Sequence, residues 1–490
     1  METFDLIILG AGSAGFAAAK AASGLRAKVA LVDQGPLGGL CILAGCMPSK
    51  ALIQSAEVYS LANRAGEFGI QVPEASPDWA RIMQRKERLV EGFAKDRTEG
   101  ITFLPDTELV MGRGRFLDGH TVQVGDRTLR AGKIILATGS VPYVPPIQGL
   151  EETGYLLSEQ ALSLPERPES LIVIGGGVIA LELGQFYARL GTKVSVFEAG
   201  PRLLGREDED VSTVIQNRLA REGVAIFTNS RSTRVLRDGQ KRLFFEQNGE
   251  SLEIEASEIL VATGRRPAID GLDLEKAGVQ MNGPMKSRMV LDRCLRTTNP
   301  DILAAGDVTG GSYLVHVAVS EGDLAAHNAL LGCRPMLSQH HLFISAAFTE
   351  PNIARVGLSE GEARQLGREV LVGKYRFADH GKAEILGETD GFVKMLADPR
   401  TGEILGSTIV GPQGAELIHE MACAITLRAT VDAFLQVPHI HPTLAEILTY
   451  PAEDILDQMR GRVRLQTTLF PAGYNDEIEE EAIERLNEIY

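Results

Sequence analysis

The start of the chain carries the pattern that most restricts its fold: a strand, a glycine-rich turn, a helix, a second strand and an acid. Residues 4–9 are nearly all apolar and predict a strand buried on both faces of a parallel sheet. The turn Gly10-Ala11-Gly12-Ser13-Ala14-Gly15 leads into a predicted helix over 16–23, and a strand over 28–32 ends at Asp33. Such glycines permit a tight turn, the approach of a pyrophosphate and close helix–strand packing, while the acid meets the ribose hydroxyls. The pattern predicts a dinucleotide-binding unit, with a tight packing turn as the alternative.

The same pattern returns further along the chain. A predicted strand over 171–174 runs into Gly175-Gly176-Gly177-Val178-Ile179-Ala180, where alanine stands in the place of the third glycine. A helix over 181–190 and a strand over 193–197 that ends at Glu198 complete the unit. Two such units predict two bound dinucleotides.

The acid of the second unit bears on the choice of nicotinamide cofactor. Glu198 favours a free ribose 2′-hydroxyl, and therefore NAD over NADP, because a carboxylate repels a 2′-phosphate. Arg202 and Arg206 lie just beyond and are the residues able to meet such a phosphate. We expect NAD.

Two cysteines lie in the stretch Gly38-Gly39-Leu40-Cys41-Ile42-Leu43-Ala44-Gly45-Cys46-Met47-Pro48-Ser49-Lys50. Close cysteine pairs in a reduced compartment are usually redox-active or metal-binding. Five residues of undistorted helix rise about 7.5 Å, more than the roughly 7 Å between Cα atoms that a disulfide allows. A bridge therefore needs an irregular backbone, which Gly45 and Pro48 would help to supply. Two buried free thiols are one alternative, and a zinc site with ligands from elsewhere is another.

Charge and cysteine count narrow the function classes. The net charge of −16 disfavours nucleic acid or an anionic membrane as a partner. Five cysteines with one close pair do not make a secreted disulfide framework. Residues 1–5 lack the positive region of a signal peptide, and no apolar run reaches the roughly 20 residues that span a bilayer. We expect a cytoplasmic protein.

The cysteine pair and a later acid indicate the first dinucleotide. A flavin passes electrons between hydride and dithiol, so a redox-active pair beside the first unit predicts a flavin there. Asp307 ends a predicted strand before a helix over 314–331. Its carboxylate could hold a polyol chain by hydrogen bonds or merely cap a helix.

The last third of the chain changes to strands separated by glycine turns and then to helices, which predicts an α+β domain without a nucleotide motif; the strands are expected at 353–357, 391–397 and 403–410, and the helices at 415–427 and 431–435. The sequence then carries His439, His441, Pro442 and Glu446. Such a spacing suits a base oriented by a carboxylate, which would fix the imidazole tautomer. Structural histidines in a loop are the alternative.

These motifs resemble those of the FAD-dependent pyridine nucleotide–disulfide oxidoreductases, and most of all the dihydrolipoamide dehydrogenase branch. The likeness covers nearly the whole chain, and its further marks are Ala137-Thr138-Gly139-Ser140, Ala262-Thr263-Gly264-Arg265-Arg266-Pro267 and Gly306-Asp307. The family usually has asparagine at the positions of Leu43 and Ala268. Mercuric reductases carry a C-terminal cysteine pair that this sequence lacks.

The resemblance implies an α/β fold with two Rossmann-like domains, for FAD and for NAD, and a C-terminal α+β dimerisation domain. The implied segments are 1–147 for the first part of the FAD domain, 148–270 for the NAD domain, 271–343 for the second part of the FAD domain, 344–470 for dimerisation and 471–490 for an acidic helical tail.

The resemblance also implies roles for the redox residues. A dithiol substrate would attack Cys41, while Cys46 stays as a thiolate against the flavin and Lys50, paired with Glu182, lies near the flavin. His441, polarised by Glu446, would take the substrate proton in the site of the other subunit of a homodimer.

Implied FAD contacts are Gly10, Gly12, Ser13, Ala14, Gly15, Asp33, Gly39, Lys50, Gly114, Thr138, Gly139, Ser140, Asp307, Leu314, Val315 and His316. Implied NAD contacts are Gly175, Gly177, Val178, Ile179, Glu182, Glu198 and Gly264.

The expected activity is that of a dihydrolipoamide dehydrogenase, which oxidises a lipoyl dithiol on a carrier protein, with no metal. A reductase of another disulfide, of a different lipoate-binding protein or of a quinone is the alternative enzyme. A non-catalytic assembly subunit is a second alternative, although such a subunit needs neither the cysteine pair nor the histidine–glutamate pair.

Overall fold

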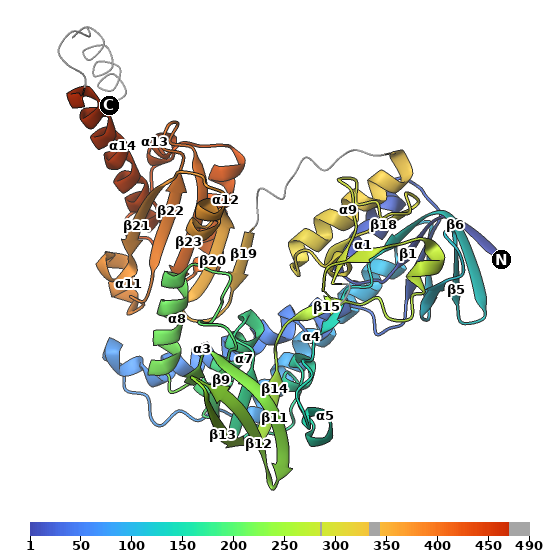
Figure 1. Cartoon of the computed structure of the whole chain (residues 1–490), viewed down its shortest axis with the longest axis horizontal. Helices are drawn as coiled ribbons and strands as arrows, with labels where there is room; N and C mark the ends of the chain where they lie inside the picture. The colour runs from blue at the N-terminus through green and yellow to red at the C-terminus, as the bar shows by residue number, and fades with distance from the viewer. Residues whose placement is uncertain (285–286, 333–343, 470–490) are drawn as a thin grey trace. The chain divides into compact units, whose positions relative to one another are not determined.

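The computed structural model describes residues 1–284, 287–332 and 344–469, with side chains up to residue 461 (Figure 1). The described residues form two compact units. The first holds the chain up to residue 332 together with Ala347–Glu350, and the second holds 344–346 and the chain from Pro351 on. The predicted helical tail over 471–490 lies outside the described residues.

The first unit contains a seven-stranded sheet in the order β3-β2-β1-β6-β5-β4, with β18 also paired to β6. Its strands are β1 (Glu2–Leu9), β2 (Val29–Asp33), β3 (Thr107–Met111), β4 (Gly114–Phe116), β5 (Thr121–Val124), β6 (Arg127–Leu136) and β18 (Ile302–Ala304). The strands β3, β2, β1, β6 and β18 are parallel to one another. Both predicted strands of the first unit, over 4–9 and 28–32, are confirmed.

Two helices rich in small residues, α1 (Ser13–Gly24) and α9 (Val315–Leu331), pack against each other on this sheet (Figure 1). A Cβ atom on Gly322 would lie 2.1 Å from the carbonyl oxygen of Ala14. Only glycine permits so close an approach of two helix backbones. The contact holds the chain after Asp307 against the first glycine turn.

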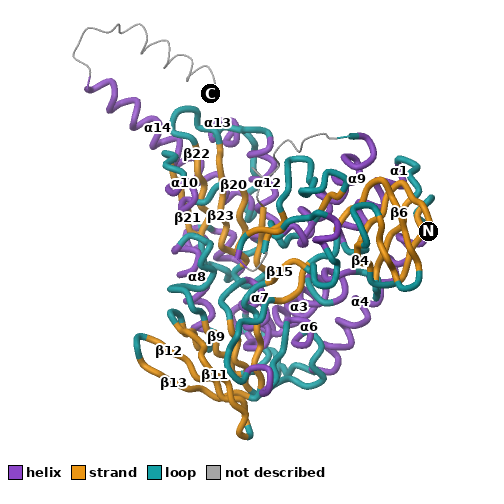
Figure 2. The backbone as a smooth tube through the Cα atoms, turned by 45° about the vertical axis from the view of Figure 1, so that its right-hand side comes forward, coloured by secondary structure: helices purple, strands orange, loops and turns teal. Residues whose placement is uncertain are grey.

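The second glycine turn belongs to a parallel four-stranded sheet in the order β10-β9-β8-β14. It consists of β8 (Ser170–Ile174), β9 (Lys193–Phe197), β10 (Ala225–Phe227) and β14 (Glu258–Val261), with helices α7 (Val178–Arg189) and α8 (Glu209–Arg221). An antiparallel sheet of β11 (Ser230–Asp238), β12 (Gln240–Gln247) and β13 (Glu250–Ala256) shares its core (Figure 2). The predicted strands and helix of this unit are confirmed, whereas the antiparallel sheet was not predicted.

The remaining elements of the first unit are short or join the sheets. They are α2 (Gly39–Leu43), α3 (Cys46–Asn63), η1 (Ala65–Phe68), α4 (Trp79–Thr102), β7 (Ser140–Pro142), α5 (Leu150–Thr153), α6 (Ser158–Ala161), β15 (Arg265–Pro267), η2 (Leu274–Ala277), β16 (Met281–Asn282), β17 (Arg288–Met289) and η4 (Gly306–Thr309).

The second unit is a five-stranded sheet in the order β19-β20-β23-β22-β21, antiparallel from β20 to β21, with an apolar core between the sheet and its helices. Its elements are β19 (Ile344–Ala347), β20 (Asn352–Gly357), α10 (Glu360–Gln365), β21 (Leu371–Arg376), η6 (Phe377–Asp379), α11 (Gly381–Leu386), β22 (Phe392–Ala397), β23 (Ile404–Gly411), α12 (Gly414–Thr426), α13 (Val431–Leu435), η7 (Ala445–Leu448) and α14 (Thr449–Leu469). The predicted α+β pattern is confirmed, and α14 was not predicted.

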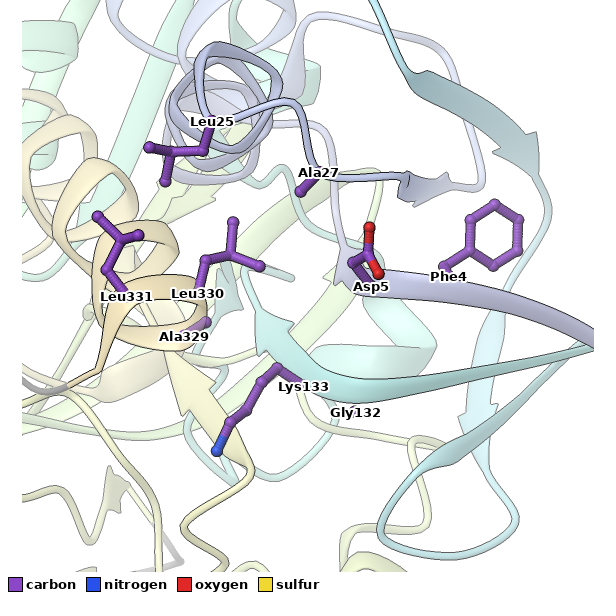
Figure 3. Close-up of a pocket in the computed structure, with 9 residues that line it drawn as sticks. All are labelled: Phe4, Asp5, Leu25, Ala27, Gly132, Lys133, Ala329, Leu330 and Leu331. Carbon is purple, nitrogen blue, oxygen red and sulfur yellow. The ribbon is translucent and has the colours of Figure 1, made fainter.

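A cavity of about 410 Å³ opens beside the first half of β1 (Figure 3). Its lining includes Phe4, Asp5 and Lys133. Because β1 reaches the glycine turn only after Leu9, this cavity lies away from the turn and from the two cysteines. Among the described residues, no helix is long and apolar enough to cross a membrane.

Candidate functional site

The two cysteines lie on either side of a break between two helices. Cys41 is within α2, and Cys46 is the first residue of α3. Ala44 (φ −148°, ψ 20°) and Gly45 (φ −134°, ψ −113°) leave helical geometry between them. A Cβ atom on Gly45 would lie 2.8 Å from the carbonyl oxygen of Leu40, so the break requires glycine. The predicted irregular backbone is confirmed, but Pro48 lies in the first turn of α3, where proline is tolerated.

The structure holds the pair as two thiols that hydrogen-bond to each other. This hydrogen bond lowers the pKa of Cys46 to about 7, assisted by the positive charge of Lys50. The same hydrogen bond, together with burial, raises the pKa of Cys41. The pair therefore ionises near pH 7, with the thiolate on Cys46 and Cys41 as its hydrogen-bond donor.

An ion pair fixes Lys50 beside this thiolate. Its Nζ lies 2.7 Å from Oε2 of Glu182, a side chain of α7 that is only 5% exposed. The other carboxylate oxygen accepts the backbone N–H of Phe348 at 2.9 Å, and Lys50 lies over the Phe348 ring at 4.5 Å from its centroid. The structure thus brings together Cys46, Lys50 and Glu182, although Glu182 lies 132 residues from Lys50 in the chain.

The first glycine turn packs against the backbone of the cysteine stretch. A Cβ atom on Gly39 (φ +67°) would be 2.7 Å from the Cα of Gly12. By contrast, a Cβ atom on Gly12 would meet nothing closer than 3.9 Å, so packing alone does not require glycine there. Because Gly12 has no side chain, there is room for a pyrophosphate at the start of α1. Ser13, Ala14 and Gly15 form the first turn of this helix.

The acid of the first unit orders this turn. One Asp33 carboxylate oxygen accepts the backbone N–H of Ala11 and the other accepts that of Gly35, both at 2.7 Å. Gly10 (φ +105°) has no space for a side chain because Ala137 lies against it. The arrangement fits a dinucleotide such as FAD, with the Asp33 carboxylate beside the turn, where it could accept hydrogen bonds from ribose hydroxyls.

A second polar group lies where β18 ends. Asp307 accepts a hydrogen bond from the Ser140 hydroxyl at 2.6 Å, and Arg265 donates to the same hydroxyl at 2.8 Å. Burial raises the pKa of Asp307. Behind it, Glu321 accepts the Gly306 N–H at 2.7 Å, and burial raises the pKa of this carboxyl to about 7. Asp307 thus lies in the 3-10 turn η4, and its carboxylate is held by the Ser140 hydroxyl. A carboxylate fixed in this way could accept hydrogen bonds from the hydroxyls of a polyol.

The other predicted FAD contacts are spread around these groups. Thr138 donates its hydroxyl to the Ala268 carbonyl, Gly139 has φ +77°, and Leu314, Val315 and His316 form the start of α9. Gly114 lies in β4, packed against Leu9, Val32 and Val122.

The second glycine turn repeats the geometry of the first. Oε2 of Glu198 accepts the Gly176 N–H at 2.8 Å, and Oε1 accepts the Gly200 N–H at 2.6 Å. Gly175 (φ +115°) lies against the Ala262 carbonyl, whereas a Cβ atom on Gly177 would meet nothing within 4 Å. Val178 and Ile179 begin α7, and Gly264 is exposed with φ +125°. This turn also fits a pyrophosphate.

The second unit carries the predicted histidine–glutamate pair. Nδ1 of His441 lies 3.1 Å from both carboxylate oxygens of Glu446, and the His441 side chain is 81% exposed. Glu446 also accepts the Thr443 N–H at 3.3 Å, and these contacts keep the pKa of Glu446 below its usual value against the effect of burial. His439 instead contacts Glu420 at 2.8 Å. The exposed Nε2 face of His441 is therefore free to meet a substrate, with its other nitrogen held by a carboxylate.

Comparison with known proteins decides the family. Residues 4–322 match the pyridine nucleotide-disulphide oxidoreductase family, and residues 344–452 match the dimerisation domain of that family. The chain belongs to the pyridine nucleotide–disulphide oxidoreductases. This family is FAD-dependent and binds NAD or NADP, and its dimerisation domain supports a homodimer. The resemblance and the fold class that the sequence predicts are confirmed.

Individual members of the pyridine nucleotide–disulphide oxidoreductases show how far the likeness extends. The chain is 35% identical to a dihydrolipoyl dehydrogenase of Bacillus subtilis, over 90% of this chain and 96% of that protein. It is also 35% identical to a mercuric reductase of Bacillus cereus, over 90% of this chain and 70% of that protein. The Cu(II) complex of the HOCl-induced flavoprotein disulfide reductase RclA of Escherichia coli superimposes with a TM-score of 0.82, at 27% identity, over 94% and 100% of the two chains. The comparisons therefore establish the family of this chain but not its substrate.

Two polar residues near the predicted FAD contacts were not assigned roles from the sequence. Arg265 directly follows Gly264, a predicted NAD contact, and its place in the motif Ala262-Thr263-Gly264-Arg265-Arg266-Pro267 could have indicated a role. Glu321 lies inside a helix of small residues and gave no signal, because its partner is a backbone N–H 15 residues away.

Proposed function

We propose that this oxidoreductase oxidises a dihydrolipoyl dithiol, held on a carrier protein, and reduces NAD⁺. The observation that carries the proposal is the His441–Glu446 pair. Forming a disulfide from a dithiol releases two protons, so the reaction needs a base, and an imidazole oriented by a carboxylate supplies one. The dihydrolipoyl dehydrogenases among the relatives support the same substrate class.

His441, Cys41 and Cys46 have separate roles in the proposed reaction. His441 takes a proton from one substrate thiol, and the resulting thiolate attacks Cys41 of an oxidised Cys41–Cys46 disulfide. A mixed disulfide forms and Cys46 leaves as a thiolate, which its lowered pKa favours. The second substrate thiol then loses its proton to solvent and attacks the substrate sulfur of the mixed disulfide, which forms the product disulfide and breaks the bond to Cys41. Cys41 leaves as a thiolate and takes the proton that His441 holds.

Bound FAD would accept the electron pair of the dithiol and pass it as hydride to NAD⁺. Gly10–Gly15, Asp33, Gly39 and Asp307 are the residues that would hold it. Lys50, paired with Glu182, would place a positive charge beside its ring.

The proposed base belongs to the second unit, which contains the dimerisation domain. We propose that His441 completes the site of the partner subunit and that residues 148–270 hold the nicotinamide cofactor. A cytoplasmic location agrees with the need for a reduced compartment.

The lowered pKa of Cys46 predicts a pH dependence. In the two-electron-reduced FAD protein, the long-wavelength absorbance of a thiolate against the flavin should be present above pH 7, lost as pH falls, and half-lost near pH 7. The Cys41→Ala protein has no disulfide to reduce, so its band is titrated with FAD oxidised; its midpoint should lie higher because the hydrogen-bond donor is gone, and Lys50→Met, titrated like the wild type, should move the midpoint upward by less. A midpoint that is unchanged in Cys41→Ala would contradict the assigned thiolate. A spectrophotometric titration of the three proteins measures it.

The carboxylate of Glu198 predicts preference for NAD⁺. We expect wild-type kcat/KM to favour NAD⁺ over NADP⁺, and Glu198→Gln to lower this preference about tenfold, a change of about 1.4 kcal/mol. Steady-state kinetics with both cofactors measures the ratio. Arg206→Gln serves as the comparison, because this exposed side chain is one of the two arginines that could favour NADP⁺. Equal ratios in wild type and Glu198→Gln would reject the NAD assignment.

One observation favours a second candidate, the reduction of another disulfide or of a quinone by a nicotinamide cofactor. Where the family usually has asparagine, Leu43 places its apolar side chain over Gly38, so that a Cβ atom on Gly38 would lie 3.0 Å from Leu43 Cγ. An apolar side chain two residues after Cys41, in place of an amide, changes the polarity of the surroundings that a substrate meets at the disulfide. Parallel assays with NADH and lipoamide, glutathione disulfide or a quinone decide between the candidates.

A further inference from the structure

A buried histidine that no sequence motif indicated lies next to the His441–Glu446 pair. His380, between η6 and α11, is 1% exposed. Both of its ring nitrogens are enclosed, and neither has a hydrogen-bond partner among the residues that the structure describes. A buried polar group without a partner calls for an explanation, because its desolvation is not compensated.

Glu446 lies between this imidazole and that of His441. Its Oε1 is 3.1 Å from Nδ1 of His441 and 3.7 Å from Nε2 of His380. A hydrogen bond from N–H to oxygen is about 2.7–3.2 Å long. A movement of the carboxylate by well under 1 Å would therefore complete a bond to His380.

The surroundings of His380 hold its ring in place. The ring meets the edge of Tyr450, on α14, with centroids 6.1 Å apart, and Tyr450 stacks on Tyr375 at 4.2 Å. The Tyr375 hydroxyl donates to the carbonyl of Asp379, the residue before His380, at 2.8 Å. These contacts hold the imidazole in place, so the remaining gap would close by a small shift of the Glu446 carboxylate, which His441, the Thr443 N–H and Tyr450 also contact.

The titratable groups around His380 are Glu446 from η7, His441 from the preceding loop and Tyr450 from α14. Burial lowers the pKa of His380, and His441 acts in the same direction while Glu446 opposes it. A neutral imidazole donates one proton without cancelling the charge of Glu446. It therefore leaves that charge available to His441.

We propose that His380 is a positioning residue, whose buried Nε2–H steadies the Glu446 carboxylate in the orientation that receives Nδ1–H of His441. The proposal rests on the proposed role of His441 as the base. It extends the pair to a chain of three residues, from the exposed base to the apolar core of the second unit.

The test uses the FAD-loaded protein and dihydrolipoamide. We expect His380→Phe to lower kcat about 10- to 100-fold, the usual cost of losing such an outer partner, with KM changed less than twofold. Because a loosened Glu446 stabilises the imidazolium less, the acid limb of the kcat/KM profile should move to lower pH, in the same direction as in Glu446→Gln. The double variant should be no slower than Glu446→Gln alone. His380→Gln, whose amide nitrogen replaces Nε2, should restore most of the rate.

An unmoved acid limb together with additive losses in the double variant would overturn the proposal. If His380→Phe fails to fold, His380→Asn replaces it, since its amide reaches the position of Nδ1 and should behave as a loss. His327→Gln, an exposed imidazole–carboxylate pair with Asp323 on α9, is the control. Full dithiol turnover in His441→Ala would instead reject the base itself. If wild type does not oxidise dihydrolipoamide, the substrate assignment fails, and the same profiles are measured with NADH and 5,5′-dithiobis(2-nitrobenzoic acid).

Discussion

Replacing Cys46 by serine is expected to abolish dithiol turnover while FAD remains bound. The loss should exceed about 1,000-fold in kcat, the scale on which enzymes respond when an essential nucleophile is removed. Without Cys46 there is no disulfide to oxidise the substrate, and a hydroxyl does not replace the thiolate whose pKa the structure lowers to about 7. The long-wavelength absorbance of the two-electron-reduced protein should disappear as well. Steady-state kinetics and an anaerobic absorbance titration measure the two effects.

A matched variant separates this effect from general damage. Cys423 on α12 is also an exposed free thiol, and it is part of neither the cysteine stretch nor the histidine–glutamate pair. Cys423→Ser should retain both the turnover and the long-wavelength band. Persistence of the band in Cys46→Ser would show that another group is the thiolate against the flavin.

Removing the imidazole of His441 should separate the two halves of the reaction. We expect His441→Ala to lower dithiol turnover by about 100- to 10,000-fold, the contribution typical of general acid–base catalysis. Transfer of hydride from NADH to an artificial dye needs no base for a thiol, so this activity should be retained. The comparison requires both assays on one preparation, with bound FAD quantified.

The outcome also tests whether His441 serves its own subunit or the partner. A mixed dimer of Cys46→Ser and His441→Ala subunits holds one site with both residues intact if the base acts across the dimer, and none if it acts within one chain. Recovered dithiol turnover after mixing, absent for either variant alone, is the expected result. Equal loss of dithiol and dye activities in His441→Ala would mean that the residue is structural.

The glycine turns could be predicted because their backbone conformation and close contacts require glycine at fixed positions in a short stretch of sequence. Gly10 and Gly175 both have positive φ, and both lie against the carbonyl of the residue that follows the neighbouring strand, so no other residue fits. The pairing of His441 with Glu446 was likewise readable from a spacing of five residues. Each of these signals depends on residues close in the chain.

Other features depend on contacts that no local pattern reports. Glu182 meets Lys50 across 132 residues, and only the family resemblance indicated it. His380 stands alone in a polar segment, and its importance arises from burial beside Glu446. Side-chain environments created by tertiary packing were therefore missed.

The pairing of β18 with β6 has a consequence for how the protein is made. Ile134 on β6 can pair with Ile302 only after β18 has been synthesised. The chain between them contains a complete four-stranded sheet of its own. At about 5–20 residues per second, a ribosome needs on the order of 10 to 30 s to bridge that interval. The sheet that begins later in the chain can thus finish folding first, while the edge of β6 stays open. Nascent chains halted before residue 300 would expose that edge to pairing with other chains.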